Sequence, residues 1–278
     1  MIKFLFWNTR RKVLENLVAE LCQIHQIDIL ILVENTALPS QMLSSLNVNS
    51  SSYRFHHSPS EKTKLYSRLS NTSIKNIRDN IDVSFRLIRL PSKKDILLVA
   101  AHLPSKLHMN LADQSQLCVR ISQLIREVEL KIGHQRTIVV GDFNMNPFED
   151  GLISSEGFHA VMTRTIASKG TRKVRQVEKP FFYNPMWNRF GDSHIHGRFG
   201  PKPAGTYYYQ DAKPVTFFWH MFDQVLIRPE LLDCFDDQDL HIITTAGNNS
   251  LIRADQTPNA KVASDHLPII FTLKLIDR

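Results

Sequence analysis

Few cysteines and no long apolar run limit the class of protein that this chain can belong to. Only three cysteines, Cys22, Cys118 and Cys234, occur among the 278 residues, far apart in the sequence. Their number and spacing fit neither a zinc site nor a disulfide framework, so we expect buried thiols in a reducing, cytoplasmic setting. No apolar run approaches the roughly 20 residues that a membrane-spanning helix needs, so we expect no membrane insertion. The sequence also lacks internal repeats and low-complexity tracts.

The opening residues and the charge balance narrow the class further. Residues 1–7 are mostly apolar, and a basic group at residues 10–12 follows them, an order that favours a first strand over a secretory signal. With 42% apolar and 22% charged residues, the composition is typical of a globular enzyme, and we expect a single domain over residues 1–278. The net charge of +7 suggests an anionic partner, although charge alone does not distinguish nucleic acid from anionic lipid. Nothing in the composition indicates the oligomeric state.

The stretch from Thr137 to Asn144 carries the clearest local signal. An apolar, β-branched run leads into Gly141, which is typical of a buried strand that ends at a turn. Asp142 and Asn144 then lie two positions apart and therefore on the same side of the chain. Because ligands of open α/β sheets bind outside the carboxyl ends of strands, this acid and this amide are candidates for a functional crevice.

Hydrophobic periodicity indicates strands and helices in both halves of the chain. Helical spacing covers residues 11–25, 38–46 and 111–132. Strand patterns cover residues 2–8, 28–33, 53–57, 63–67, 81–90, 95–103, 137–142, 221–227, 240–245 and 267–273. This order predicts an α/β (α+β) fold with two mixed, mostly antiparallel sheets packed face to face and helices on both outer sides.

Polar side chains stand at or near an end of six of the predicted strands, and together they predict a site. They are Asn8, Glu34, His102, Asp142 with Asn144, Asp223, and Asp265 with His266. No cysteine contributes, so the set suits a hard divalent ion such as Mg²⁺ better than zinc. Such an ion would relieve repulsion among the acids, and a metal with amides and histidines is what hydrolysis of a phosphate ester needs.

Six short motifs resemble, in their order, those of the endonuclease/exonuclease/phosphatase superfamily, the DNase I-like group. They are Trp7-Asn8, Val33-Glu34-Asn35, His102-Leu103-Pro104-Ser105, Gly141-Asp142-Phe143-Asn144, Phe222-Asp223-Gln224-Val225 and Ser264-Asp265-His266. The resemblance spans residues 7 to 266. It implies a four-layer α/β sandwich and hydrolysis of phosphoesters that depends on Mg²⁺ or Mn²⁺.

The resemblance also implies a role for each matching residue at the metal. Glu34 would be the principal metal ligand, Asn8 would lie beside it, and Asp265 would lie close to a metal position. The number of metal ions is left open.

The catalytic roles that the resemblance implies fall to five further residues. Asp142 would orient the attacking water or accept its proton, and Asn144 would hold that water or the phosphate. His266 would contact a phosphoryl oxygen while Asp223 bonds its other ring nitrogen and fixes the tautomer. His102 would be a second phosphate donor, and the identity of the general base stays open.

A basic and aromatic segment at about residues 158–220 points to the substrate. Residues 164–189 contain seven Lys or Arg and one acid, and thirteen aromatic residues follow between positions 181 and 222. Single-strand binders combine positive charge along the backbone with aromatic rings that stack on bases. We therefore select Lys173, Arg175, Tyr208 and Trp219 as candidate substrate-binding residues in an insertion within the single domain.

Three functions compete on this evidence. A nuclease acting on DNA or RNA is favoured by the basic and aromatic segment. A phosphatase or phosphodiesterase acting on a phosphoinositide, a sphingolipid or a small phosphate would use the same core residues. An inactive binding homologue is less favoured, since every expected catalytic position holds a competent side chain.

Overall fold

Two mixed sheets form the centre of the computed structural model, which describes residues 1–48, 52–60, 62–192, 202–210, 212 and 214–275. The six-stranded sheet has the order β16 (His241–Ile242), β19 (Ile269–Leu273), β1 (Ile2–Asn8), β2 (Ile29–Val33), β4 (Thr63–Ser67), β3 (Arg54–His56). The seven-stranded sheet has the order β5 (Ile74–Asp79), β6 (Val83–Ile88), β7 (Ile96–His102), β8 (Thr137–Asp142), β15 (Asp223–Ile227), β12 (Phe182–Tyr183), β9 (Ala160–Val161). Both sheets are mixed and mostly antiparallel, as predicted.

Helices and hairpins complete the fold. The α-helices are α1 (Glu15–His25), α2 (Pro39–Leu46), α3 (Leu111–Ile132), α4 (Asp150–Ile153) and α5 (Arg164–Ala167), with 3₁₀ turns at Pro185–Arg189, Pro229–Cys234 and Asp237–Asp239. Three two-stranded hairpins are β10 (Thr171–Val174) with β11 (Val177–Pro180), β13 (Tyr207–Tyr208) with β14 (Trp219–His220), and β17 (Thr245–Ala246) with β18 (Asn249–Ser250). No helix in the described ranges has the length and apolar character that crossing a membrane requires.

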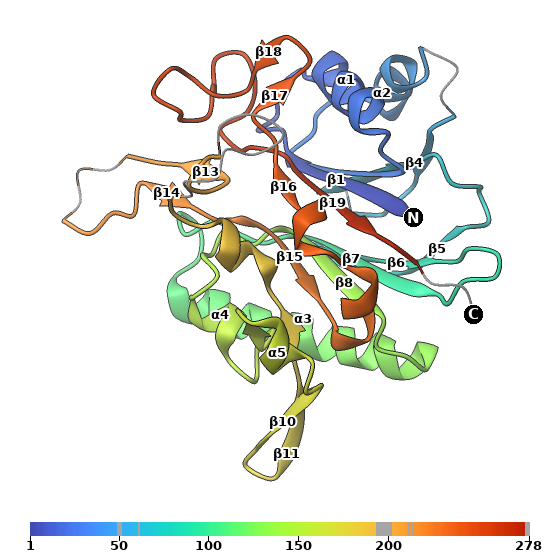
Figure 1. Ribbon diagram of the computed structural model, residues 1–278, viewed down its shortest axis with the longest axis vertical. Coiled ribbons are helices and arrows are strands. Elements are labelled where there is room, and N and C mark those ends of the chain that lie inside the picture. Colours follow the sequence, from blue (N-terminus) through green and yellow to red (C-terminus); the bar gives the residue numbers. More distant parts are fainter. Residues whose placement is uncertain (49–51, 61, 193–201, 211, 213, 276–278) are drawn as a thin grey trace.

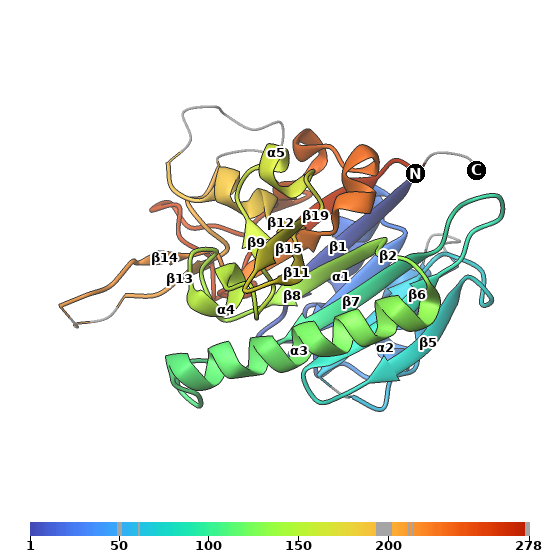
Figure 2. The same ribbon diagram turned by 90° about the horizontal axis from the view of Figure 1, so that it is seen from below.

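Three apolar clusters give the molecule four layers. The inner faces of the two sheets bury one cluster between them, which includes Phe4, Phe271, Leu98 and Val140. The outer face of the six-stranded sheet packs against α1 and α2, and that of the seven-stranded sheet packs against α3. Figure 1 shows α1 and α2 above the sheets and α3 below them, and Figure 2 shows α3 lying along the outer sheet face. The predicted sandwich with helices on both outer sides is therefore confirmed.

The sheet topology collects distant parts of the chain at one edge. Strand β1 runs parallel to β2, and β7 runs parallel to β8. In each pair, the carboxyl ends of both strands therefore lie at the same edge of the sheet. Strands β19 and β15 are antiparallel to β1 and β8, so their first residues meet the same edge. A side chain at Gly141 would collide with the carbonyl of Ala101 on β7, so only glycine permits this close strand pairing.

The structure departs from the sequence prediction at an edge strand and at residues 240–245, where β16 (His241–Ile242) and β17 (Thr245–Ala246) in different sheets replace one predicted strand. Strand β5 was not predicted because it is an edge strand whose exposed positions are polar, so its apolar alternation is weak. The segment at about 158–220, which we expected to be an insertion, has only short strands, of which β9 and β12 join the seven-stranded sheet and the others form two hairpins. Residues 193–201 of this segment lie outside the described residues.

Candidate active site

Asn8 and Glu34 stand at the carboxyl ends of two parallel strands. Asn8 is the last residue of β1, and Glu34 directly follows β2. The Asn8 amide nitrogen donates hydrogen bonds to Glu34 Oε1 at 3.2 Å and to Asp142 Oδ2 at 2.9 Å. Asn8 therefore links the carboxylates of the two sheets across the sandwich.

Asp142 and Asn144 lie at the end of β8, opposite this amide. Asp142 is buried, and its Oδ1 accepts the backbone N–H of Asn144 at 2.9 Å. The Asn144 side-chain nitrogen donates to the Leu103 carbonyl at 2.9 Å, which fixes the orientation of the amide. Asp142 thus presents Oδ2 to the site while its other oxygen is held by the turn.

His266 and Asp223 form a buried pair beside Asp142. His266 Nδ1 lies 2.8 Å from Asp223 Oδ2, and its Nε2 lies 3.9 Å from Asp142 Oδ2. Burial favours the neutral imidazole, but the negative charges of Asp223 and Asp142 outweigh it and raise the pKa of His266 to about 10. Burial also raises the pKa of Asp223. We assign the proton to the imidazole because two carboxylates face it, whereas one imidazolium faces Asp223.

His102 and Asp265 lie at the rim of the same edge. His102 ends β7, and its Nε2 lies 3.5 Å from Glu34 Oε1. The hydrogen bond from His102 is the main cause that lowers the pKa of Glu34 to about 2, so Glu34 is ionised. Asp265 Oδ2 pairs with Arg10 Nε at 3.1 Å. His102 therefore contacts the expected metal ligand in this structure.

Two site residues adopt backbone conformations that side chains rarely tolerate. The φ angle is 47° at Glu34 and 51° at Asn144, both in the left-handed region. Such conformations cost of order 1–3 kcal/mol each and concentrate at functional sites. Both residues directly follow the strands β2 and β8 or lie in the turn after them, so these left-handed conformations occur where the strands end at the site.

The donor set fits a hard divalent cation at Glu34. Among the described residues, Asp142, Asp223 and His266 form a group of acids and histidine compact enough to hold a metal ion, with ligand atoms within 4.8 Å of one another. Within this group, His266 Nδ1 and Asp223 Oδ2 are already paired with each other at 2.8 Å. Glu34 is ionised and partly exposed, and carboxylate and amide oxygens suit Mg²⁺ or Mn²⁺. The Asn8 amide oxygen accepts the backbone N–H of Arg10 at 2.9 Å, so the amide nitrogen is the atom that faces the carboxylates in this structure.

The four predicted substrate-binding residues occupy two different hairpins. Lys173 and Arg175 are exposed on and beside the β10–β11 hairpin, which Figure 1 shows projecting away from the sheets. Tyr208 and Trp219 pair across the β13–β14 hairpin, with ring centroids 5.4 Å apart, and Trp219 packs against an apolar cluster. The structure thus brings together the expected catalytic and metal residues, and it separates the basic pair from the aromatic pair.

Sequence reasoning missed several residues that shape the site. Tyr207 lies against the His266 ring at 4.6 Å between centroids, and Thr206 Oγ1 accepts the N–H of Asp223 at 3.0 Å. The Trp7 indole donates to the His266 carbonyl at 2.8 Å. Arg10 was visible as a charge next to Asn8, but its ion pair with Asp265 depends on a contact across 255 positions, which no local pattern indicates.

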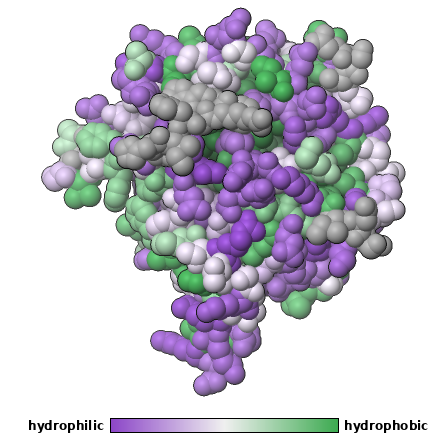
Figure 3. All heavy atoms as spheres, in the orientation of Figure 1, coloured by the Kyte–Doolittle hydropathy of each residue, from purple (hydrophilic) through white to green (hydrophobic). Residues whose placement is uncertain are grey.

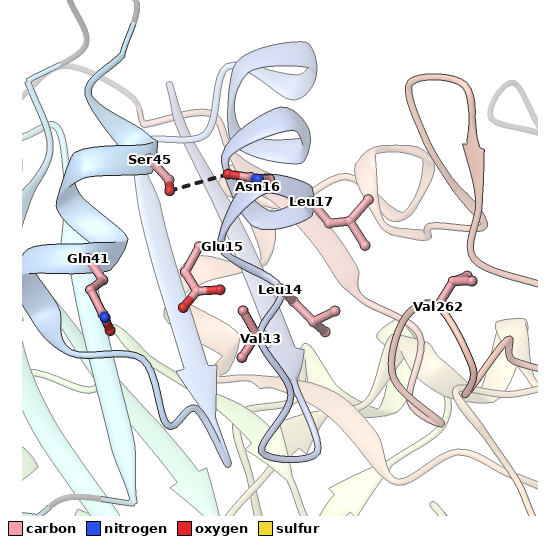
Figure 4. A pocket seen from close by; sticks show the side chains of 8 residues that line it. All are labelled: Val13, Leu14, Glu15, Asn16, Leu17, Gln41, Ser45 and Val262. Carbon is pink, nitrogen blue, oxygen red and sulfur yellow. Dashed lines mark hydrogen bonds between the residues drawn. The ribbon is translucent and has the colours of Figure 1, made fainter.

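A separate cavity of about 310 Å³ lies between the start of α1 and α2. Figure 4 shows Asn16 and Ser45 pointing toward each other there, with their hydrogen bond drawn, beside Leu14 and Val262. None of the predicted site residues lines this cavity, and Glu15 is the one acid in its wall. It therefore offers no cluster of catalytic groups.

The two-sheet sandwich, with acids, amides and histidines gathered at one edge, defines a DNase I-like protein. The sequence matches the profile of the Endonuclease/Exonuclease/phosphatase family over residues 5–266, and the chain belongs to that family. No curated protein sequence matches the chain.

Solved structures with the same fold include several enzymes at low sequence identity. The endonuclease domain of TRAS1, a telomere-specific non-LTR retrotransposon, is 14% identical with a TM-score of 0.55, and 99% of each chain is covered. An AP endonuclease from Archaeoglobus fulgidus is 14% identical with a TM-score of 0.54, covering 98% of this chain and 99% of that one. The human Nocturnin catalytic domain is 13% identical with a TM-score of 0.53, covering 99% and 93%. At these identities the likeness establishes the fold.

Proposed function

We propose that the protein is a nuclease, a phosphodiester hydrolase that depends on Mg²⁺ or Mn²⁺ and attacks phosphorus with water. The observation that carries the proposal is the edge where Asn8 bridges Glu34 and Asp142 while His266 faces Asp142. Membership of the family supports phosphoester hydrolysis, and the endonucleases among the solved structures with this fold support a nucleic acid substrate. The buried, unpaired cysteines support a reducing, cytoplasmic setting.

Two residues have complementary roles in the proposed hydrolysis: Asp142 acts on the attacking water, and His266 acts on a phosphoryl oxygen. Asp142 Oδ2 is positioned to orient a water or accept its proton. The 3.9 Å between His266 Nε2 and Asp142 Oδ2 is too long for a hydrogen bond, so the Nε2 proton is available to a phosphoryl oxygen. Asp223 holds His266 in orientation through Nδ1. A divalent ion at Glu34, Asn8 and Asp265 would supply charge neutralisation at the phosphate.

The first test measures turnover with single-stranded DNA, duplex DNA, RNA, a phosphoinositide and sphingomyelin, each with Mg²⁺ or Mn²⁺. We expect cleavage of a nucleic acid and loss of cleavage in excess EDTA. Asp142→Ala and His266→Ala should each lower turnover by about 10²–10⁴-fold, the usual contribution of a positioned acid or base.

The matched control is Asp233→Ala, which removes an exposed carboxylate from the 3₁₀ turn at Pro229–Cys234. It should retain wild-type turnover, and circular dichroism should show that all variants are folded. Near-normal turnover in Asp142→Ala, or activity that persists in EDTA, would reject the proposed site. Cleavage of the phosphoinositide or sphingomyelin alone would assign the site to the other class of phosphoester.

A further inference from the structure

A series of aromatic rings leads away from the catalytic histidine. Tyr207 lies 4.6 Å from His266 and stacks on Phe222 at 5.2 Å between centroids. The His220 ring lies 4.6 Å from Phe222 and 6.2 Å from Phe217. We call these four residues beyond His266 the aromatic path. Three of them belong to the β13–β14 hairpin or to its loop, which Figure 1 shows projecting beside the sheets.

The aromatic path ends at a cavity of about 310 Å³ between that hairpin and the start of α3. Phe217 and Phe148 form its aromatic walls, with ring centroids 5.4 Å apart, and Lys106, Gln114 and Glu149 line it as well. The volume is at the lower end of the roughly 300–1,000 Å³ that small-molecule pockets occupy. The cavity is therefore large enough for one small group.

The polar groups of the cavity favour a ligand with N–H donors. Lys106 Nζ donates to Glu149 Oε1 at 2.6 Å and lies 5.8 Å from the centre of the Phe222 ring. Glu149 Oε2 and Gln114 Oε1 are buried acceptors without a hydrogen-bond partner among the described residues, and Gln114 is 1% exposed. Buried acceptors of this kind call for a donor, and the amino and imino groups of nucleobases are donors.

The exposure of the hairpin rings also points to stacking. Phe217 is 54% exposed and Phe218 is 44% exposed, which is unusual for large apolar side chains so close to a catalytic site. Figure 3 shows apolar residues gathered over this hairpin, whereas the β10–β11 hairpin at the bottom of the same view is hydrophilic. A nucleobase matches these exposed rings because every base has a π-face that can stack on them.

We propose that the aromatic path and its cavity bind an unpaired nucleobase of a single strand whose phosphate lies at His266, an inference that rests on the proposed nuclease function. In a duplex the base faces are stacked within the helix, so only an unpaired base can stack on the exposed face of Phe217 at the mouth of the cavity. Stacking on an aromatic side chain contributes about 1–3 kcal/mol per base and tolerates any sequence.

The test is a binding measurement by fluorescence anisotropy in EDTA, which prevents cleavage. The probes are a 12-nucleotide single-stranded DNA, the same strand with abasic tetrahydrofuran sites, and the corresponding duplex. We expect the base-containing strand to bind more tightly than the other two. Phe217→Ala should weaken binding of that strand by about 5- to 150-fold, the equivalent of one lost stacking contact, and leave the abasic strand unchanged.

Two further variants and a small substrate separate the possible causes of a change. Phe217→Tyr keeps a stacking ring and should bind like wild type. Lys173→Glu with Arg175→Glu should weaken binding of the base-containing and abasic strands equally and should lower the salt slope, because the charge reversal removes contacts with phosphates. Hydrolysis of bis(4-nitrophenyl) phosphate by the wild-type protein with Mn²⁺ tests the catalytic site separately from base binding, because this ester carries no nucleobase. Equal binding of base-containing and abasic strands by the wild type, or an unchanged affinity in Phe217→Ala, would overturn this inference. Failure of the wild type to hydrolyse any phosphodiester would instead overturn the proposed function.

Discussion

At the scale of single residues, burial and neighbouring charges change the pKa of a histidine side chain outside the candidate site. His56 on β3 illustrates this, because its Nε2 lies 2.7 Å from Ser67 Oγ on the neighbouring strand. Burial, helped by the charges of Arg86 and Arg54, lowers the pKa of His56 from 6.5 to about 4. The folded protein therefore holds this imidazole neutral at pH 7.

His56 should make the protein less stable in mild acid. In the unfolded chain the imidazole takes up a proton below about pH 6.5. In the folded protein it takes up the proton only near pH 4, so the unfolded state binds more protons between these values. The contribution of neutral His56 to the free energy of unfolding is complete above pH 6.5 and is lost as the pH falls toward 4. Urea unfolding at pH 7 and pH 5 should show a smaller loss of stability in His56→Gln than in wild type.

The matched control for this prediction is His108→Gln, since His108 is exposed and its loss should leave the pH dependence unchanged. If His56→Gln loses as much stability as wild type between pH 7 and pH 5, the buried neutral state of His56 is not a source of acid sensitivity.

At the scale of secondary-structure elements, a buried ion pair fastens α3 to the seven-stranded sheet. Arg228, directly after β15, donates to Glu129 Oε1 at 2.8 Å and Oε2 at 3.1 Å, and both side chains are at most 2% exposed. Arg228 also donates to the carbonyls of Pro180 and Phe181, and its guanidinium lies 3.8 Å from the centre of the Phe182 ring. One side chain thus joins a helix, a central strand and the segment that leads into β12.

Arg228→Met should destabilise the protein by about 3–5 kcal/mol, because it leaves the buried Glu129 carboxylate without its cation. Chemical denaturation measures the loss. Arg78→Met is the control, since the Arg78–Glu127 pair is about half exposed and exposed pairs contribute about 0–1 kcal/mol. The double variant Arg228→Met with Glu129→Leu should recover part of the loss. A loss in Arg228→Met no larger than in Arg78→Met would contradict the proposed role of the pair.

The elements also show which features a sequence can reveal. Strand β8 and helix α3 were predictable because their apolar spacing is local and strong, and the acid and amide after Gly141 follow from strand period alone. Strand β5 escaped prediction because an exposed edge strand has little apolar pattern. The contact of Tyr207 with His266 and the donor orientation of Asn8 arise from tertiary packing. The residues that make these contacts are far apart in the sequence, so hydrophobic periodicity cannot predict them.

At the scale of the whole molecule, the candidate site joins the two ends of the chain. Asn8 is the last residue of β1, and Glu34 directly follows β2. Asp265 lies shortly before β19, the strand that pairs with β1. These side chains are brought to one edge only when the six-stranded sheet has formed. In the unfolded chain Glu34 and Asp265 are separated by more than 200 positions, so that chain has no preformed site for a divalent ion.

A divalent ion should therefore stabilise the folded protein. A ligand that binds only the folded state adds RT ln(1 + [L]/Kd), about 2.7 kcal/mol at 100 times its Kd. Titration with Mg²⁺ or Mn²⁺ should raise the Tm in a concentration-dependent way, and EDTA should reverse the rise. Glu34→Gln removes the charge of the proposed principal ligand and should abolish the rise, whereas Glu127→Gln, at an exposed position of α3, should retain it. An equal rise in Glu34→Gln and wild type would place the ion elsewhere and remove Glu34 from the proposed metal site.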